Sequence, residues 1–302
     1  MIRFLVLPVL ALALALGAPA AQGAQQRPLK VFISADMEGI AGAVTGDQLG
    51  PGGFEYERFR RIMTGEVRAA IEGAREAGAT EILVADSHGN GENLLIEDLP
   101  ADVTVVRSWP RPLMMMQGID STFHAAVFIG YHASVVNPLG VRAHTISSAR
   151  LQDVRLNGRS VTEGAINAAI AAHFGVPVVA VSGDDAAVAE VRAAVGDIEG
   201  AVVKWSYSFH SARTMVPEAA ARLIREKVAA GVRRRAEFRP APPRAPVQLD
   251  VRFRFYRPAE MLAYLPIVER TDAHTIRYTG PDMIAVSRFI EFITTYAVNL
   301  EP

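Results

Sequence analysis

Residues 29–38 read LKVFISADME and decide the fold. The first six form an apolar run of the length of one buried strand, and two acidic residues, Asp36 and Glu38, follow it directly. The pattern recurs at residues 81–88, EILVADSH, and at residues 125–133, AAVFIGYHA. Apolar strands that end in polar residues are typical of a buried parallel sheet whose carboxyl ends carry function.

Helices and strands are expected to alternate along the following sequence. Apolar side chains at helical spacing predict a helix over residues 56–77, and an Ala-rich stretch predicts another over residues 161–174. Further short strands are expected at residues 103–107 and 177–181. This alternation predicts an α/β fold, with a mainly parallel sheet and helices on both of its faces.

The composition changes near residue 232, where three arginines precede four prolines within residues 233–246. Beyond this connection we expect strands at 247–255 and 276–278 and an amphipathic helix at 283–297. The predicted organisation is a signal peptide over residues 1–24, an α/β metal-binding catalytic domain over 28–205 and a smaller α+β domain over 206–302.

The composition excludes several classes of site. The chain has 302 residues, no cysteine, 50% hydrophobic residues and a formal net charge of −1. Without cysteine there are no disulfides, thiolate metal sites or cysteine nucleophiles, so a metal ion would be held by His, Asp, Glu or water. The nearly balanced charge argues against a nucleic-acid partner.

The first residues have the pattern of an export signal. Arg3 supplies the positive start, residues 4–16 the apolar segment, and residues 18–23 small side chains for cleavage. A retained membrane anchor is the alternative, but the apolar run is short, contains Pro8 and lacks a basic stop. We expect cleavage, a periplasmic or secreted protein, and no membrane contact of the mature chain.

The polar residues at the strand ends form a candidate metal site. Loops beyond the carboxyl ends of parallel strands converge on one crevice. They carry Asp36, Glu38, His88 and His132, and Glu163 begins the Ala-rich helix. Such a set suits zinc, manganese or another divalent ion, and a carboxylate can bridge two ions. Taken alone, each carboxylate could instead cap a helix or bind loop amides.

The residues alone leave the reaction open. The sequence contains no HExxH pair, P-loop, GxSxG or complete GxGxxG motif. Spacing and composition therefore indicate a metal site in an α/β enzyme and no more. Asp86 and Asn93 are candidates to orient the imidazole ligands, or simply to form a turn.

A series of short motifs resembles the zinc-dependent D-aminopeptidase family of the dipeptide-operon type. The matches keep their order and approximate spacing over residues 30–220. They are SADMEGIAG at 34–42, RIMT at 61–64, DSHG at 86–89, GYHA at 130–133, GVRAHT at 140–145, the stretch 157–167, GDD at 183–185 and AVVK at 201–204. The DMEG, DSH and GYHA blocks together are highly specific.

The resemblance implies a two-zinc aminopeptidase that removes N-terminal D-amino acids from short peptides. The export signal adds D-Ala as the expected residue, because it places the enzyme where wall fragments that contain D-Ala are found. The resemblance places the metal ligands on five residues, Asp36, Glu38, His88, His132 and Glu163, and the catalytic role on His144. It also implies a homo-oligomer, with a decameric ring as one arrangement and the sites facing an internal channel.

Two features depart from the family pattern. The family is cytoplasmic, whereas this chain begins with an export signal. Downstream of Lys204 the family tends to carry a basic residue, where this chain has Phe209-His210-Ser211. Two alternatives therefore remain beside the aminopeptidase: a metal-dependent amidase or esterase with another small substrate, and a periplasmic protein that binds peptides without cleaving them.

Overall fold

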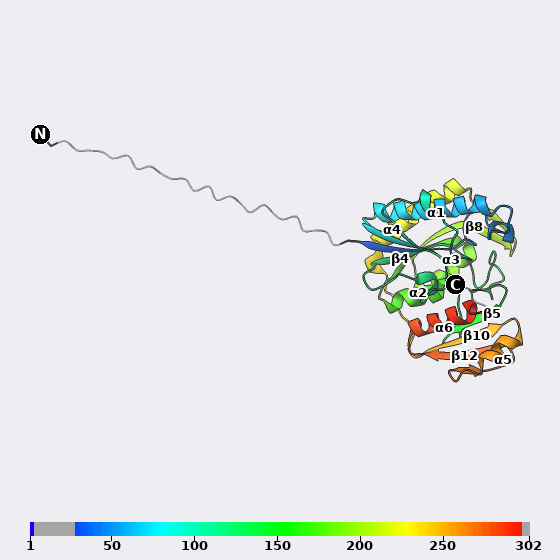
Figure 1. The fold of residues 1–302 in the computed structure, drawn as a ribbon. Coiled ribbons are helices and arrows are strands. Elements are labelled where there is room, and N and C mark those ends of the chain that lie inside the picture. The colour runs from blue at the N-terminus through cyan, green and yellow to red at the C-terminus, as the bar shows by residue number, and fades with distance from the viewer. Residues whose placement is uncertain (3–27, 298–302) are drawn as a thin grey trace.

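The computed structural model describes residues 1–2 and 28–297, and Figure 1 shows their arrangement. The predicted signal peptide lies outside the described residues, apart from its first two. Two sheets organise the rest of the chain. None of the described helices is long and apolar enough to cross a bilayer.

The larger sheet has seven strands in the order β3-β2-β1-β4-β7-β8-β9. Neighbouring strands are parallel except for β8 and β9. Their bounds are Lys30–Ala35 (β1), Glu81–Asp86 (β2), Thr104–Val106 (β3), Ala125–Tyr131 (β4), Val178–Asp184 (β7), Glu199–Ser208 (β8) and Ser211–Thr214 (β9). The strand order reverses direction between β1 and β4, so the carboxyl ends of these two strands border the crevice where such sheets bind ligands.

Helices cover both faces of this sheet. The helices α1 (Tyr56–Glu76) and α4 (Pro217–Arg233) pack on one face, and α2 (Glu163–His173) and α3 (Asp185–Val195) pack on the other. Alternate side chains of β1 serve the two layers: Val31 and Ile33 pack with the α1 layer and Phe32 with the α2 layer. The predicted mainly parallel α/β fold is confirmed.

Local sequence signals set the start and end of α2. The Thr162 side chain accepts a hydrogen bond from the Ala165 amide at 2.9 Å and caps the helix. Beyond its end, Gly175 takes a φ of +74°, a conformation that suits glycine. The cap matters for function because it places Glu163 in the first turn of α2, facing the sheet end.

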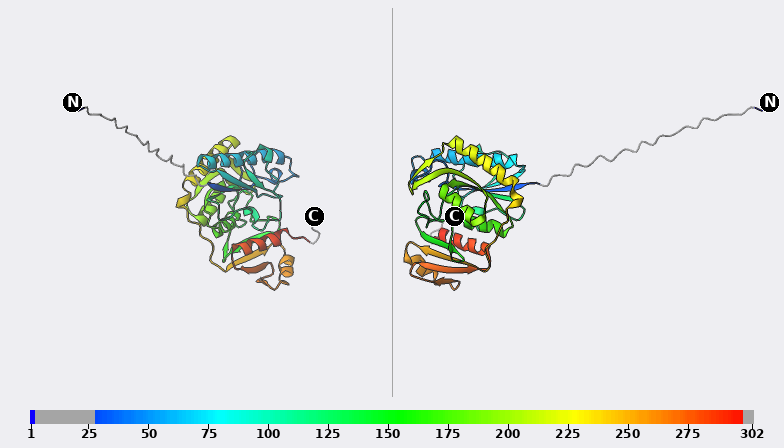
Figure 2. Two further views of the ribbon diagram at one scale, coloured as in Figure 1. Left: turned by 60° about the vertical axis from the view of Figure 1, so that its left-hand side comes forward. Right: turned by 180° about the vertical axis from the view of Figure 1, so that it is seen from behind.

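The smaller sheet is antiparallel, with the order β11-β12-β10-β5-β6. Figure 2 shows it at one end of the molecule, on the α2 side of the larger sheet. Its elements are Leu151–Leu156 (β5), Arg159–Ser160 (β6), Val247–Phe253 (β10), Val268–Arg270 (β11), Thr275–Gly280 (β12) and the helices Tyr256–Leu262 (α5) and Met283–Thr295 (α6). The described residues also form 3-10 turns at Gly46–Gln48, Ile96–Asp98, Met114–Met116 and Arg235–Glu237.

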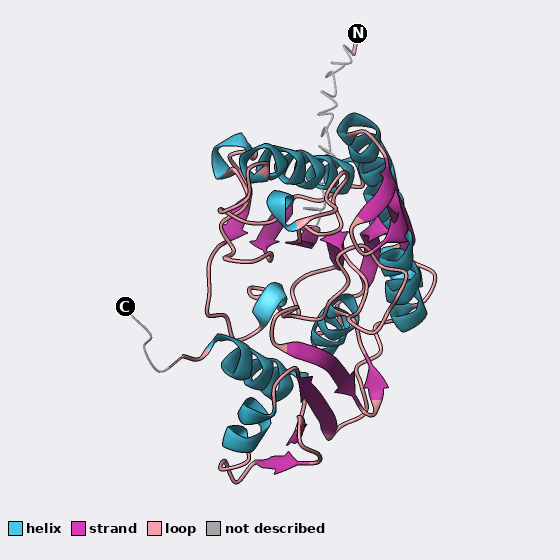
Figure 3. Cartoon of the chain, turned by 90° about the vertical axis from the view of Figure 1, so that its right-hand side faces the viewer, coloured by secondary structure: helices cyan, strands magenta, loops and turns pink. Residues whose placement is uncertain are grey.

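The boundary that we expected at residue 205 does not separate the two sheets. The strand β5 lies before it in sequence but pairs with β10 in the smaller sheet, while β9 and α4 lie after it and belong to the larger layer. One core cluster joins Ile166 of α2 with Phe289 of α6, so the two layers share apolar side chains. Figure 3 shows the smaller sheet and its helices packed below the larger sheet. The pairing of β5 is non-local, and no short-range pattern signals it.

The close contact between α1 and α4 gives a test of this packing. An added Cβ at Gly73 would lie 2.4 Å from the Arg225 carbonyl oxygen, whereas nothing lies within 4 Å of a Cβ at Gly65 on the same helix. We expect Gly73→Ala to lower the free energy of unfolding by about 1–3 kcal/mol through overpacking. Gly65→Ala should raise it by about 0.5–1 kcal/mol, since alanine favours the helix. Urea unfolding measures both, and equal stability of the two variants would contradict the described packing.

Candidate metal centre

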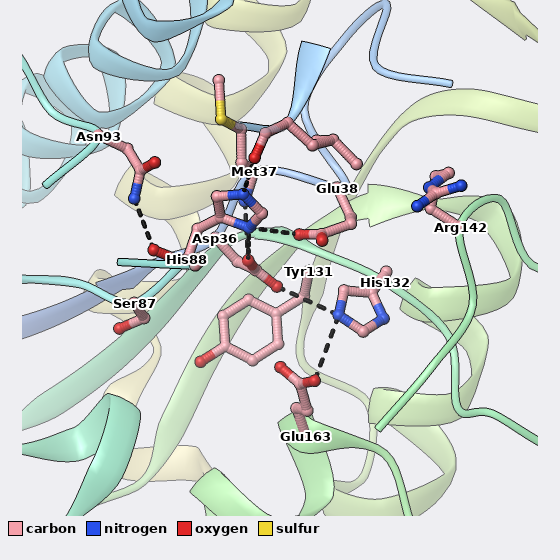
Figure 4. Close-up of polar contacts among 12 residues, drawn as sticks. Asp36, Met37, Glu38, Ser87, His88, Asn93, Tyr131, His132, Arg142 and Glu163 are labelled. Atoms are coloured by element: carbon pink, nitrogen blue, oxygen red, sulfur yellow. Dashed lines mark hydrogen bonds and ion pairs between the residues drawn. The ribbon is translucent and has the colours of Figure 1, made fainter. Parts of the chain in front are cut away.

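The five predicted ligands come together at the carboxyl ends of β1, β2 and β4, as Figure 4 shows. Asp36 and Glu38 follow β1, His88 lies in the loop after β2, His132 follows β4, and Glu163 begins α2. Each is at most 6% exposed. Three carboxylates and two imidazoles therefore share one pocket from which bulk water is excluded.

Asp36 lies at the centre of the group. Its Oδ1 is 3.3 Å from His88 Nδ1, and its Oδ2 is 3.4 Å from His132 Nε2. On the outer sides, His88 Nδ1 lies 2.8 Å from a Glu38 oxygen and His132 Nε2 lies 3.4 Å from Glu163 Oε1. The two Asp36 oxygens thus face two separate groups of ligand atoms.

These atoms fit metal coordination better than a hydrogen-bond network. Asp36 Oδ2 and Glu38 Oε2 are buried and form no hydrogen bond of good geometry among the described residues, although His88 Nδ1 lies 2.8 Å from the Glu38 oxygen. Donors bound at 2.0–2.2 Å to one tetrahedral ion lie about 3.4 Å apart, close to the separations around Asp36. Two sets of ligand atoms within 4.8 Å of one another are present: Asp36, Glu38 and His88, and His132, His144 and Glu163. Nitrogen and oxygen donors of this kind suit zinc.

Backbone carbonyls fix the orientation of three histidine rings. In each ring one nitrogen lies within hydrogen-bond distance of a carbonyl oxygen, which can only accept, so that nitrogen carries the proton. The pairs are His88 Nε2 with Leu49 (2.6 Å), His132 Nδ1 with Ala133 (3.0 Å) and His144 Nδ1 with Arg142 (2.9 Å). The other nitrogen of each ring faces the cluster and can bind an ion or a proton.

The charges in the pocket shift one another's pKa values. Burial, reinforced by the nearby Glu38 carboxylate, raises the pKa of Asp36 to about 7. Burial opposes the charged form of His132, but the carboxylates of Glu163, Asp36 and Glu38 together outweigh burial and raise that pKa to about 10. Without metal, the His88 and His132 rings are therefore held as cations, and their positive charge balances the negative charge of the carboxylates.

His144 differs from the other two imidazoles. Its Nε2 lies 4.0 Å from Glu38 and 3.8 Å from Glu163, and its ring stacks on His132 with the centroids 4.0 Å apart. Burial and the His132 charge lower its pKa, so the ring is neutral near pH 7. It is also the most exposed of the three rings, with 14% of its side chain accessible. A neutral ring at the edge of the cluster can exchange protons with a substrate.

Asp86 and Asn93 form a turn and do not contact the imidazole rings. Asp86 accepts hydrogen bonds from the Asn93 and Leu94 amides at 2.6 and 2.7 Å, and Asn93 Nδ2 donates to the His88 carbonyl at 2.6 Å. The two residues hold the backbone of the His88 loop. Of the two interpretations of these residues, the structure therefore supports the turn.

Two residues that our sequence analysis gave no role hold the loop after β1. The buried Lys204 ammonium donates to the carbonyl oxygens of Glu38, Ile40 and Ala43, and burial lowers its pKa to about 8. Gly39 lies against β4, where a Cβ would be 2.0 Å from the Tyr131 carbonyl oxygen. The signal for Lys204 in the sequence was a lysine within the otherwise apolar stretch of strand β8, which indicates a buried charge with polar partners.

The Phe209-His210-Ser211 segment, which departs from the family pattern, connects β8 to β9. The Arg142 guanidinium lies over the Phe209 ring, 4.9 Å from its centroid. A basic side chain is therefore present next to the segment where the expected basic residue is missing.

Replacing Asp36 by asparagine tests whether the pocket is built for cations. The pKa of Asp36 is raised from 3.8 to about 7 by folding, so its ionisation costs stability as pH rises between these values. At pH 8 without metal, Asp36→Asn should therefore raise Tm, by roughly 3 °C for each kcal/mol regained. With zinc the order should reverse, because the wild type binds the ion more tightly.

A carboxylate of the smaller sheet provides the control. Asp250 pairs with Arg277 at 2.7 Å, far from the cluster in the fold. Asp250→Asn should lower Tm by the same amount with and without zinc. A zinc response of Asp36→Asn equal to that of the wild type would contradict a metal role for this residue.

Comparisons with known proteins agree with the geometry. The sequence model of a family described as D-aminopeptidase matches residues 29–292. A D-aminopeptidase of Bacillus subtilis (strain 168) is 34% identical over 273 residues, which cover 90% of this chain and 98% of that protein.

A solved structure extends the likeness to three dimensions. The Zn-dependent D-aminopeptidase DppA from Bacillus subtilis, a self-compartmentalizing protease, superposes with a TM-score of 0.85 at 32% identity. The match covers 90% of this chain and 99% of the other.

Proposed function

The chain belongs to the D-aminopeptidase family, and from this membership we propose that it is an exported two-zinc aminopeptidase that releases N-terminal D-amino acids from short peptides. It is a hydrolase of the peptidase class, as the family and the zinc-dependent structural relative indicate. The single observation that carries the proposal is the pair of ligand groups on either side of Asp36.

We assign the ligands by their distances. Asp36, Glu38 and His88 would hold one zinc ion, and His132 and Glu163 the other, with Asp36 shared between them. Bound zinc would polarise the scissile carbonyl and lower the pKa of a water molecule toward 7. The second ion would hold the free amine of a substrate, which favours cleavage at the N-terminus.

His144 is the proposed proton carrier. Its Nδ1–H is held by the Arg142 carbonyl, so Nε2 is free and points toward Glu38 and Glu163. A neutral imidazole in this position can take a proton from the attacking group and return it to the leaving amine. Attack by the imidazole itself is the other role that this geometry permits.

Export and assembly complete the proposal. The charged and apolar pattern of residues 1–24 supports a periplasmic or secreted enzyme, which would meet wall fragments that contain D-Ala. A homo-oligomer, with a decameric ring as one arrangement, is supported by the self-compartmentalizing relative. The smaller unit also exposes apolar side chains that an assembly could cover, including Phe255, Tyr264, Ile267 and Tyr296.

The two alternative functions differ in how well they fit the site. A protein that only binds peptides has no need for two buried groups of metal ligands beside a neutral histidine. An amidase or esterase could use the same groups, and only its substrate differs.

The variant His144→Ala tests the assignment of roles. We expect it to keep its zinc content and its Tm, because the proposed ligands are all retained. Its kcat should fall by about 10²-fold or more, the scale of a lost acid–base group. Elemental analysis and kinetics on the same preparation decide the matter: loss of zinc from His144→Ala would make the residue a ligand instead.

Paired substrates of opposite chirality test the activity itself. Zinc-restored enzyme should release D-Ala from short peptides at least about tenfold faster than L-Ala from the matched L-peptides. The amine and the scissile carbonyl of the substrate are both held in place. Only one configuration at the α-carbon therefore puts the side chain into its pocket. Equal rates for both hands would refute D-specificity, and failure to cleave any substrate with a free amine would favour the amidase alternative.

A further inference from the structure

Arg142 is a cation without a protein partner at the edge of the candidate metal centre. No hydrogen bond or ion pair from its guanidinium is formed within the part of the chain that the structure describes, and its Nε is buried. Buried donors are almost always paired. Arg111 also leaves one buried nitrogen, Nη1, without a partner, but its Nε and Nη2 donate to the carbonyl oxygens of Ser108 and Asp86. The unpaired guanidinium therefore needs a different explanation.

The position of Arg142 is fixed by its neighbours. Its amide donates to the Phe209 carbonyl oxygen at 3.0 Å, and its guanidinium lies over the Phe209 ring. Its φ of +55° lies in the left-handed region, which non-glycine residues occupy only where the surroundings hold them there. The guanidinium is thus held by aromatic stacking, which leaves its N–H donors free.

The same residue is tied to the reacting groups. The Arg142 carbonyl accepts the Nδ1–H of His144, whose Nε2 lies 4.0 Å from Glu38. Figure 4 shows Arg142 beside Glu38, on the side away from His88. The carboxylates of the metal centre therefore lie next to a guanidinium that has no hydrogen-bond or ion-pair partner among the described residues.

We propose that Arg142 binds the C-terminal carboxylate of the substrate and thereby selects very short peptides, dipeptides above all. A guanidinium offers two parallel N–H donors that match a carboxylate. When the substrate amine lies at the metal centre, a dipeptide carries its own carboxylate one residue beyond the scissile bond. The inference rests on the proposed aminopeptidase function and adds to it a limit on peptide length.

The test compares an acid with its amide. D-Ala-D-Ala and D-Ala-D-alaninamide differ only in the charge at the C-terminus, so both are assayed with zinc-restored wild type, Arg142→Met and Arg142→Lys. We expect the wild type to prefer the acid by at least about tenfold in kcat/KM, mainly through KM. Arg142→Met should lose this preference, so that the ratio of kcat/KM for acid and amide falls to about one, mainly because KM for the acid rises. Arg142→Lys should retain part of the preference.

Arg213→Met serves as the matched control. Arg213 also stacks on an aromatic ring, that of Trp205 at 4.4 Å, but is exposed on β9. Its variant should keep the wild-type ratio of acid to amide. The main-chain contacts of Arg142 remain in both of its variants, and an unchanged Tm checks that the loop stays folded.

The outcomes separate this inference from the proposed function. A wild type that cleaves both substrates equally well refutes the carboxylate role and leaves the aminopeptidase intact. An Arg142→Met variant that loses the same factor on both substrates also refutes it, because Arg142 would then only support His144. A wild type that cleaves neither substrate refutes the proposed function itself.

Discussion

Asp36, Glu38 and Glu163 bring three carboxylates into one buried pocket, and their mutual repulsion is the constraint on which the site depends. Burial strengthens the repulsion because little water is present to screen it. The pocket is stable only if positive charge is supplied among the carboxylates. In the metal-free chain the histidines supply it, as the raised pKa values of His88 and His132 show.

The parallel sheet brings the carboxylates and imidazoles of the site together. The strand order reverses between β1 and β4, which opens a crevice at their carboxyl ends, and the capped first turn of α2 adds Glu163 from a third direction. Main-chain atoms then complete the arrangement. Carbonyl oxygens orient the imidazole rings, and the Lys204 ammonium donates hydrogen bonds to the carbonyl oxygens of the loop after β1. Rigid backbone therefore positions the side chains of the site.

Local sequence patterns predicted much of this architecture. Apolar runs with polar ends located β1, β2 and β4, and the convergence of parallel strand ends predicted that Asp36, Glu38, His88 and His132 lie together. The smaller sheet was harder to predict because β5, with its mixed burial pattern, pairs with β10 nearly a hundred residues away. Lys204 and Arg142 could not be given roles, since their significance lies in tertiary contacts with loops distant in sequence.

We propose that Asp36 is shared by two metal ions, one on each side. An anomalous difference map from zinc-loaded crystals, recorded above and below the zinc absorption edge, tests it directly. The account predicts two peaks per chain, one beside Glu38 and His88 and the other beside His132 and Glu163, with an oxygen of Asp36 next to each. A single peak, or peaks away from these residues, would contradict it.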